Sequence, residues 1–245
     1  MHLVAAPGRL ELRVVDGPDE EIVGGRPVFA DLSLIDVSSN AGRSLKQPIA
    51  KALGIKKRSD EAPTVIDTTA GWGEDAWVMA ALGCKVLCVE RSKIVATLLR
   101  DALLRAGVSD MAMLGRVSVV TADSKHLLRR LSRLHEEPAS DLPAEMRAFL
   151  SPDVVYLDPM FPGSDSRKGA ERKPMRVLRR LVGEDGDAAE LFAWALRVAK
   201  KRVVVKRPMK APPLQVPAGF APMATEPDIV FEGKGYRFDV TVTGK

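Results

Sequence analysis

Residues 154–183 read VVYLDPMFPGSDSRKGAERKPMRVLRRLVG, and this stretch decides the fold. The apolar run Val154–Leu157 is typical of a strand that is covered on both faces, as in the parallel sheets of α/β proteins. Asp158 follows this strand directly. Because ligands of open α/β sheets bind beyond the carboxyl ends of the strands, Asp158 is predicted to lie at the edge of a binding site.

Strand and helix patterns alternate on both sides of this stretch from about Ala62 onward. The other predicted parallel strands lie in TVIDTTAG, KVLCVE, VSVVTAD and RVVVKRP, and helical patterns such as EDAWVMAALG, residues 92–106 and DAAELFAWALRVAK lie between strands, the last with Asp187 as its N-cap. The segment DIVFEGKGYRFDVTVTG is typical of two strands joined by a Gly-Lys-Gly turn. The sequence therefore predicts an α/β fold with a doubly wound sheet and an antiparallel C-terminal hairpin.

The first sixty residues do not follow this rhythm. LELRVV and PVFADL alternate like two exposed strands, and residues 47–54, with Pro48 near the start, are typical of a short helix. The charged stretch KKRSDEAP separates them from the first core strand. We therefore expect a small β-rich appendage over residues 1–60 and a Rossmann-like domain over residues 61–245.

Composition narrows the class of protein. Of 245 residues, 46% are hydrophobic and 28% charged, which is typical of a folded, soluble protein. No apolar run is long enough to span a membrane, and Arg9, Glu11 and Arg13 stand where a signal sequence would be apolar, so we expect a cytoplasmic protein. The two cysteines and three scattered histidines match no recognisable zinc pattern, and no metal is expected.

The net charge of +5 and the pI of about 9.3 favour an anionic partner. Basic residues concentrate just after the Asp158 segment, at Arg167, Lys168, Arg172, Lys173, Arg176, Arg179 and Arg180. Such a run is often only a solvated helix face, but its adjacency to a candidate site favours phosphate binding. Lys206 and Arg207, which end the fifth strand, are predicted to contact phosphate of the same anionic partner, with a capping or core-edge role as the open alternative.

Acidic residues end four successive strands, at Asp67, Glu90, Asp123 and Asp158. Between the first strand and its helix, Gly71 and Gly73 allow the backbone to pass close to a ligand at the helix N-terminus. Glu90 lies where an acid accepts hydrogen bonds from ribose hydroxyls. A ring of acids favours a cationic ligand such as S-adenosylmethionine, with its sulfonium and ammonium groups, and disfavours the pyrophosphate of NAD.

The motif Asp-Pro-Met-Phe resembles the D/N-P-P-Y/F motif of methyltransferases that act on exocyclic amines of nucleobases. The strings TAGWGEDAWVMAALGCKV, VVYLDPMFP, RVVVKRP and KGYRFDV also resemble, in the same order, the bacterial ribosomal RNA small subunit methyltransferase J family, from about Leu10 to the C-terminus. This resemblance implies a methyltransferase version of the Rossmann sheet, S-adenosylmethionine as cofactor and N2-methylguanosine in 16S ribosomal RNA as product. The implied partner is ribosomal RNA or the small ribosomal subunit.

By this resemblance, the cofactor contacts are Glu74, Asp75, Glu90, Arg91, Asp123, Ser124 and Asp158, in addition to Asp67, Gly71 and Gly73. The sequence departs from the family pattern where Glu74-Asp75 replaces Arg-Asp and where Asp123-Ser124 replaces Ser-Ser. The family's glycine-rich basic segment appears here as DVSSNAGRSLKQ, in which only Arg43 and Lys46 are basic.

The chemistry expected at Asp158 follows from the target. An exocyclic amine is a weak nucleophile, and Asp158 with the Pro159 carbonyl can accept its two hydrogens, orient its nitrogen and stabilise charge on it. Phe161 is predicted to stack on the unstacked base, with a rigid apolar turn as the alternative. Three other functions stay open: an adenine-N6 methyltransferase on DNA or RNA, an NAD-dependent oxidoreductase, which Glu74-Asp75 disfavours, and a non-catalytic RNA-binding protein.

Overall fold

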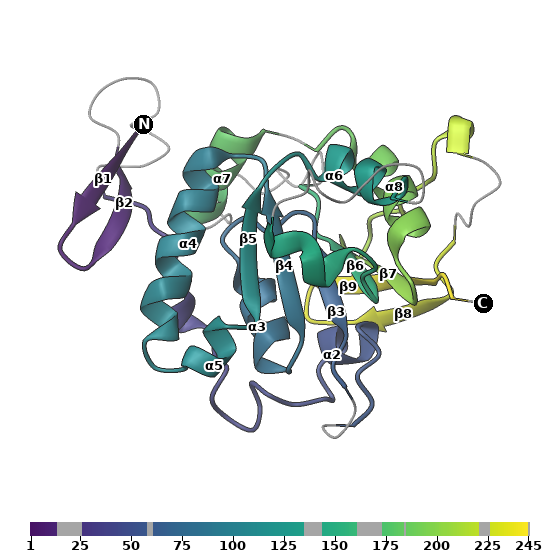
Figure 1. The fold of residues 1–245 in the computed structure, drawn as a ribbon, viewed down its shortest axis with the longest axis horizontal. Helices are drawn as coiled ribbons and strands as arrows, with labels where there is room; N and C mark the ends of the chain where they lie inside the picture. Colours follow the sequence, from purple (N-terminus) through teal and green to yellow (C-terminus); the bar gives the residue numbers. More distant parts are fainter. Residues whose placement is uncertain are drawn as a thin grey trace.

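Seven strands form the central sheet, in the order β5-β4-β3-β6-β7-β9-β8 (Figure 1). The structure is a computed structural model that describes residues 1–13, 26–57, 61–134, 144–160, 173–183, 185–220 and 226–244. The strands of this sheet are β3 (Thr64–Asp67), β4 (Lys85–Glu90), β5 (Val117–Thr121), β6 (Val154–Leu157), β7 (Arg202–Pro208), β8 (Ile229–Glu232) and β9 (Tyr236–Val242). Strands β3 to β7 are parallel, and β9 runs antiparallel to both β7 and β8. The predicted α/β sheet with an antiparallel hairpin is confirmed.

The order of the strands places a topological switch point between β3 and β6. From β3 the chain proceeds outward to β4 and β5, and it then returns to pair β6 with the other side of β3. Asp67 at the end of β3 is in register with Tyr156 of β6. The carboxyl ends of these two strands therefore form the crevice where such sheets bind ligands.

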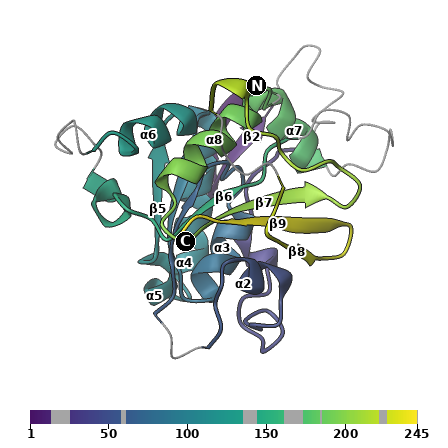
Figure 2. The same ribbon diagram turned by 90° about the vertical axis from the view of Figure 1, so that its right-hand side faces the viewer.

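Helices cover both faces of the sheet (Figures 1 and 2). They are α2 (Pro48–Ala52), α3 (Glu74–Ala81), α4 (Lys93–Gly107), α5 (Met111–Leu114), α6 (Ser124–Leu131), α7 (Lys173–Val182) and α8 (Ala188–Val198), with the 3-10 helices η1 (Leu32–Leu34), η3 (Ala144–Phe149) and η5 (Ala218–Phe220). Successive strand residues alternate between two hydrophobic clusters, so that Val65 packs with α3 and α4, and Ile66 packs with α6 and α8. This alternation explains why the strands are apolar on both faces.

The N-terminal segment differs from the prediction in one strand. Strand β2 (Arg9–Arg13) was expected, but its partner is β1 (His2–Ala6), and the two form a separate antiparallel hairpin. The prediction of a second strand in PVFADL was wrong, because Val28 makes only an isolated bridge to Leu12 and Pro27 has no N–H to donate to a ladder. The chain turns instead into η1, which Asp31 caps through the Ser33 amide.

The hairpin segment does not stand apart from the core. Leu12, Val28 and Leu32 are buried in the same hydrophobic cluster as Val65 of the central sheet, so these positions are not the exposed ones that the alternation suggested. The short helix near Pro48 is confirmed as α2. The division of the chain at residue 60 stays a prediction.

Helix termini agree with the sequence signals, with one exception. Gly83 follows α3 with a φ of +100°, as expected for a residue just beyond a helix end. Asp187 occupies the N-cap position of α8, but its side chain makes no capping hydrogen bond and lies near Arg91 and Lys125 instead. In the part of the chain that the structure describes, no helix has the length and apolar character needed to cross a membrane.

Candidate active site

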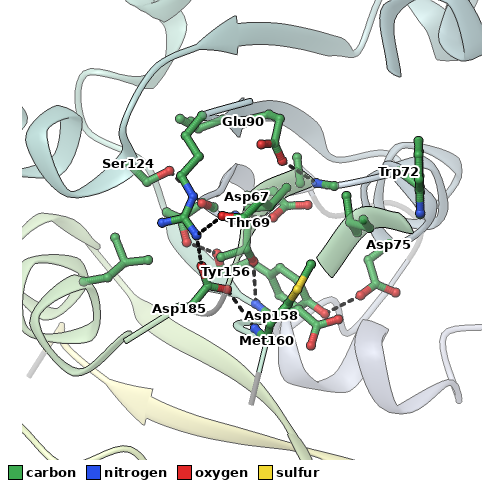
Figure 3. Close-up of a pocket in the computed structure, with 18 of the residues that line it drawn as sticks. Asp67, Thr69, Trp72, Asp75, Glu90, Ser124, Tyr156, Asp158, Met160 and Asp185 are labelled. Carbon is green, nitrogen blue, oxygen red and sulfur yellow. Dashed lines mark hydrogen bonds and ion pairs between the residues drawn. The ribbon is translucent and has the colours of Figure 1, made fainter. Parts of the chain in front are cut away.

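A pocket of about 200 Å³ opens at the carboxyl edge of the sheet, at the switch point (Figure 3). Its walls come from the turn after β3, the ends of β4, β6 and β7, the start of α6 and one side of α7. All ten residues predicted to contact the cofactor line it: Asp67, Gly71, Gly73, Glu74, Asp75, Glu90, Arg91, Asp123, Ser124 and Asp158. The strand-end rule thus brought together residues up to 91 positions apart in the sequence (158 − 67).

The turn between β3 and α3 requires its glycines. Gly71 and Gly73 have φ values of +52° and +77°, in the left-handed region that favours glycine. A Cβ atom on Gly73 would come within 2.3 Å of Leu99 Cδ1 on α4, so the turn also packs too closely for a side chain. The turn brings the first residues of α3 against the pocket.

Glu90 closes the pocket at the end of β4. The residue is only 4% exposed, and its carboxylate accepts hydrogen bonds from the Gly71 amide (3.1 Å) and the Ser92 amide (2.7 Å). Burial raises the pKa of Glu90, and the two amides oppose that rise. The two amides orient an acceptor at the position expected for ribose hydroxyls.

Asp67 lies at the floor of the pocket, at the end of β3. It is 2% exposed and accepts a hydrogen bond from the Thr69 amide at 3.1 Å. Burial raises the pKa of Asp67 to about 8, with a further contribution from the carboxylates of Asp75 and Asp158. At neutral pH much of Asp67 is therefore protonated.

Asp123 and Ser124 have structural contacts as well as a place in the pocket wall. Asp123 is the N-cap of α6, where its carboxylate accepts from the His126 amide at 3.0 Å. The Ser124 hydroxyl donates to the Thr68 carbonyl at 2.6 Å, which ties the start of α6 to the turn after β3. A cap role was the alternative for any single strand-end acid, and Asp123 fulfils it.

Asp158 is held from two directions. Its amide donates to Thr69 Oγ1 at 2.7 Å, and its Oδ2 lies 3.0 Å from Lys206 Nζ. Burial raises the pKa of Asp158, Lys206 counteracts this, and the Asp75 carboxylate adds to the rise. Although 41% of the side chain is exposed, the carboxylate lines the pocket, where burial first and then the carboxylates of Asp75 and Asp185 raise its pKa.

Lys206 does not occupy the position that the sequence suggested. Its ammonium lies in the pocket between Asp158 and Asp75, 2.7 Å from Asp75 Oδ2. The Asp75 carboxylate also accepts from the Tyr156 hydroxyl at 2.6 Å. Two carboxylates thus take up the charge that was predicted to meet an RNA phosphate.

The prediction that Arg207 contacts phosphate was wrong. Arg207 is only 2% exposed, and its guanidinium donates to the Pro212 carbonyl, with Nε at 3.1 Å. The core-edge alternative describes it correctly. Adjacent residues of a strand point to opposite faces, so the pocket position of Lys206 sends Arg207 into the other side of the sheet.

Two pocket residues, Trp72 and Asp185, were not expected from the sequence. Trp72 Nε1 donates to the Pro174 carbonyl at 3.2 Å, and Asp185 accepts from the Met160 amide at 2.7 Å and from Arg91 Nη2 at 2.8 Å. These contacts attach the first turn of α7 and the loop that follows α7 to the pocket. Trp72 lies between Gly71 and Gly73, so its position in the ligand-binding turn could have indicated a pocket residue. Asp185 lies in a loop with no motif, so no sequence signal pointed to it.

Part of the predicted RNA contact lies outside the described residues: Phe161, Arg167, Lys168 and Arg172. Lys173 begins α7, and Arg176 is exposed on that helix. Leu178 of the same helix is buried and lines the pocket. Helix α7 therefore places an apolar side chain against the pocket and carries Arg176 on its solvent side.

The comparison with known proteins gives a consistent result. A sequence family described as "Putative SAM-dependent methyltransferase" matches residues 1–243. The ribosomal RNA small subunit methyltransferase J of Vibrio campbellii is 41% identical over 252 residues, which cover 98% of this chain and 85% of that protein. The protein of the same name from Thioalkalivibrio sulfidiphilus is 43% identical over 200 residues, 81% of this chain and 68% of that protein.

The chain belongs to the ribosomal RNA small subunit methyltransferase J family. A crystal structure of a SAM-dependent methyltransferase from Neisseria gonorrhoeae supports the same fold, with 30% identity, a TM-score of 0.64, and coverage of 98% of this chain and 82% of that one. The predicted family and the predicted cofactor, S-adenosylmethionine, are confirmed.

Proposed function

We propose that this protein transfers a methyl group from S-adenosylmethionine to the exocyclic N2 amine of a guanosine in small-subunit (16S) ribosomal RNA. The observation that carries the proposal is the placement of Asp158, which directly follows β6 and lines the same pocket as the other strand-end acids. The names of the relatives, which specify small-subunit ribosomal RNA, supply the class of substrate. We place this reaction in the cytoplasm.

The pocket residues fit the cofactor in charge and shape. S-adenosylmethionine, when bound, supplies a methyl group on a positively charged sulfur. Glu90 is proposed to accept hydrogen bonds from its ribose hydroxyls, because the buried carboxylate is already fixed by two backbone amides. Gly71 and Gly73 keep the wall beside α3 free of side chains, and the Asp75 carboxylate favours the cationic groups of the cofactor.

Asp158 and Pro159 are proposed to hold the target amine. The Asp158 carboxylate and the Pro159 carbonyl can accept the two N–H hydrogens, which orients the nitrogen and favours positive charge on it as the reaction proceeds. Thr69 fixes the Asp158 backbone, so the carboxylate is positioned before substrate arrives. Stacking of the base on Phe161 stays a prediction.

The RNA is proposed to dock over α7. Arg176 and Arg180 are exposed on this helix beside the pocket, and Arg167, Lys168, Arg172 and Lys173 precede or begin it in the sequence. Phosphate contacts of this kind position a nucleic acid without reading its sequence. Sequence selection must therefore come from the base that enters the pocket and from the shape of the RNA.

A methylation assay tests the proposed function. Small ribosomal subunits from a strain that lacks the corresponding gene are incubated with the protein and S-adenosylmethionine, and the digested rRNA is analysed by mass spectrometry. We expect one new N2-methylguanosine. New N6-methyladenosine would instead support the adenine methyltransferase, which the family membership does not favour, and binding without any new methylated nucleoside would support a non-catalytic RNA-binding protein.

A further inference from the structure

The Lys206 side chain crosses from β7 to the two acids at one end of the pocket. Its Nζ lies 2.7 Å from Asp75 Oδ2 on α3 and 3.0 Å from Asp158 Oδ2 after β6. Figure 3 shows both carboxylates, with the hydrogen bond from the Tyr156 hydroxyl to Asp75. The Lys206 side chain is 24% exposed, so this contact is only partly open to solvent.

The charges around this lysine are unbalanced. The carboxylates of Asp75 and Asp185 both raise the pKa of Asp158, and those of Asp75 and Asp158 raise the pKa of Asp67. Within the described residues, Lys206 is the one cation paired with the Asp158 carboxylate, and it binds Oδ2. The other ionisable groups that face the pair are the phenols of Tyr156 and of Tyr236, whose ring centroid lies 5.5 Å from Nζ.

We propose that Lys206 is a positioning residue for methyl transfer: it fixes Asp158 through Oδ2, leaves Oδ1 to receive the target amine, and keeps the carboxylate ionised. The inference rests on the proposed function and adds a residue to it. An ionised carboxylate accepts stronger hydrogen bonds than a protonated one, and its charge stabilises the positive charge that develops on the amine nitrogen. Asp75 takes part by holding Nζ from the other side.

The chain contains a matched control on the same two strands. Lys201, just before β7, pairs with Asp153, just before β6, at 2.9 Å. This pair lies at the opposite, amino end of the strands, and the Lys201 side chain is 64% exposed. A variant of Lys201 therefore removes the same kind of ion pair without touching the pocket.

The first experiment compares Lys206→Gln, Lys206→Arg and Lys201→Gln. Gln keeps a hydrogen-bond donor and removes the charge, whereas Arg keeps the charge. At neutral pH and saturating substrates, Lys206→Gln should lower the single-turnover rate by about 100-fold, the order of loss for a misplaced reacting group. The acid limb of the pH–rate profile of Lys206→Gln should move to higher pH. Lys206→Arg should restore most of the rate and return the acid limb toward its wild-type pH. Lys201→Gln should match the wild type in both rate and pH profile.

A readout without cofactor or RNA accompanies the rates. Carbon NMR of the Asp158 carboxyl follows its titration in the free protein, and Lys206→Gln should move that titration to higher pH, while Lys201→Gln leaves it in place. Asp75→Asn serves as a second variant with the opposite sign. It removes an acid that raises the pKa of Asp158, so the titration should move to lower pH.

The outcomes separate this inference from the proposed function. If the wild type forms no methylated nucleoside, the proposed function fails. If the wild type is active and folded Lys206→Gln keeps the wild-type rate and titration, Lys206 is not a positioning residue and the proposed function stands. If Lys206→Gln does not fold, Lys206→Met replaces it, and an unmoved Asp158 titration in the folded Met variant overturns the inference.

Discussion

Strands β6 and β7 carry the same ion pair at each end, and the two pairs behave in opposite ways. At the amino end, Asp153 meets Lys201 at 2.9 Å, and at the carboxyl end, Asp158 meets Lys206 at 3.0 Å. Burial raises the pKa of Asp153, but hydrogen bonds from Lys201 and Thr64 outweigh it and the pKa is lowered. At Asp158, burial and neighbouring acids prevail over Lys206, and the pKa is raised.

The difference shows what each end of the sheet contributes. The amino-end carboxylate has two partners, Lys201 and Thr64, and no acid of the described residues raises its pKa, so its charge stabilises the fold. The carboxyl-end carboxylate stands among acids in an open pocket, where its charge costs stability. Functional sites commonly carry such unfavourable groups because the chemistry requires them.

The largest effect should separate Asp158→Ala from Asp153→Ala. Loss of Asp158 should lower the single-turnover rate by about 10²–10³-fold, as is typical for removal of one group that stabilises transition-state charge, with little change in RNA affinity. Asp153→Ala, once shown to be folded, should react at the wild-type rate. Equal rates for the two variants would remove Asp158 from the mechanism.

Cofactor affinity gives the next largest contrast, between Glu90 and Glu11. Both carboxylates are nearly inaccessible, but Glu11 pairs with Arg9 and Arg13 in the N-terminal hairpin. Glu90→Ala should weaken S-adenosylmethionine binding by about 1–3 kcal/mol through loss of a charged acceptor, and Glu11→Ala should not change it. Calorimetry on both folded variants measures this, and an unchanged dissociation constant for Glu90→Ala would place Glu90 outside the cofactor site.

The carboxyl and amino ends of the sheet should also differ in how their acids make the free energy of unfolding depend on pH. Asp67 has a pKa of about 8 in the folded state against 3.8 in the unfolded state, so between these values the folded state binds more protons and stability falls as pH rises. The slope for one such group is about 1.4 kcal/mol per pH unit. Urea unfolding of Asp67→Asn and wild type from pH 5 to 8 should give two curves whose slopes differ by about this amount, with the wild type steeper. Parallel curves would mean that Asp67 titrates normally.

The smallest effect is expected at the amino end. The lowered pKa of Asp153 means that its contribution is present above pH 3.8 and is lost as pH falls through the folded-state pKa. Because Lys201 is largely exposed, Lys201→Met should cost less than about 1 kcal/mol at neutral pH. Chemical unfolding of the two proteins measures the cost, and a loss of several kcal/mol would show that this pair is not an ordinary surface pair.

The sequence predicted the parts of the site that depend on position along a strand. Asp67, Glu90, Asp123 and Asp158 each follow an apolar run, and parallel strands bring such ends together. The position of the Lys206 ammonium between Asp75 and Asp158 could not be predicted from strand ends alone, because it depends on how close β7 lies to α3. The prediction of a strand in RVVVKRP was correct, but which face of the sheet the Lys206 and Arg207 side chains point to was not assigned from the sequence.

The errors have the same physical origin. The alternation in PVFADL satisfies the strand pattern, yet only Val28 pairs with β2, because Pro27 has no N–H to donate and the chain then turns into η1. Asp185 approaches the pocket only because Arg91 and the Met160 amide draw its loop inward. Contacts between elements that are distant in sequence leave no local pattern.

The most direct test of the account is the position of the target guanine. A structure of the protein on the small ribosomal subunit with S-adenosylhomocysteine would locate it. We predict that the guanine N2 lies within about 3.2 Å of an Asp158 carboxylate oxygen and of the Pro159 carbonyl oxygen, the range for such hydrogen bonds. A guanine N2 that lies against other groups, with Asp158 still paired only to Lys206, would contradict the account.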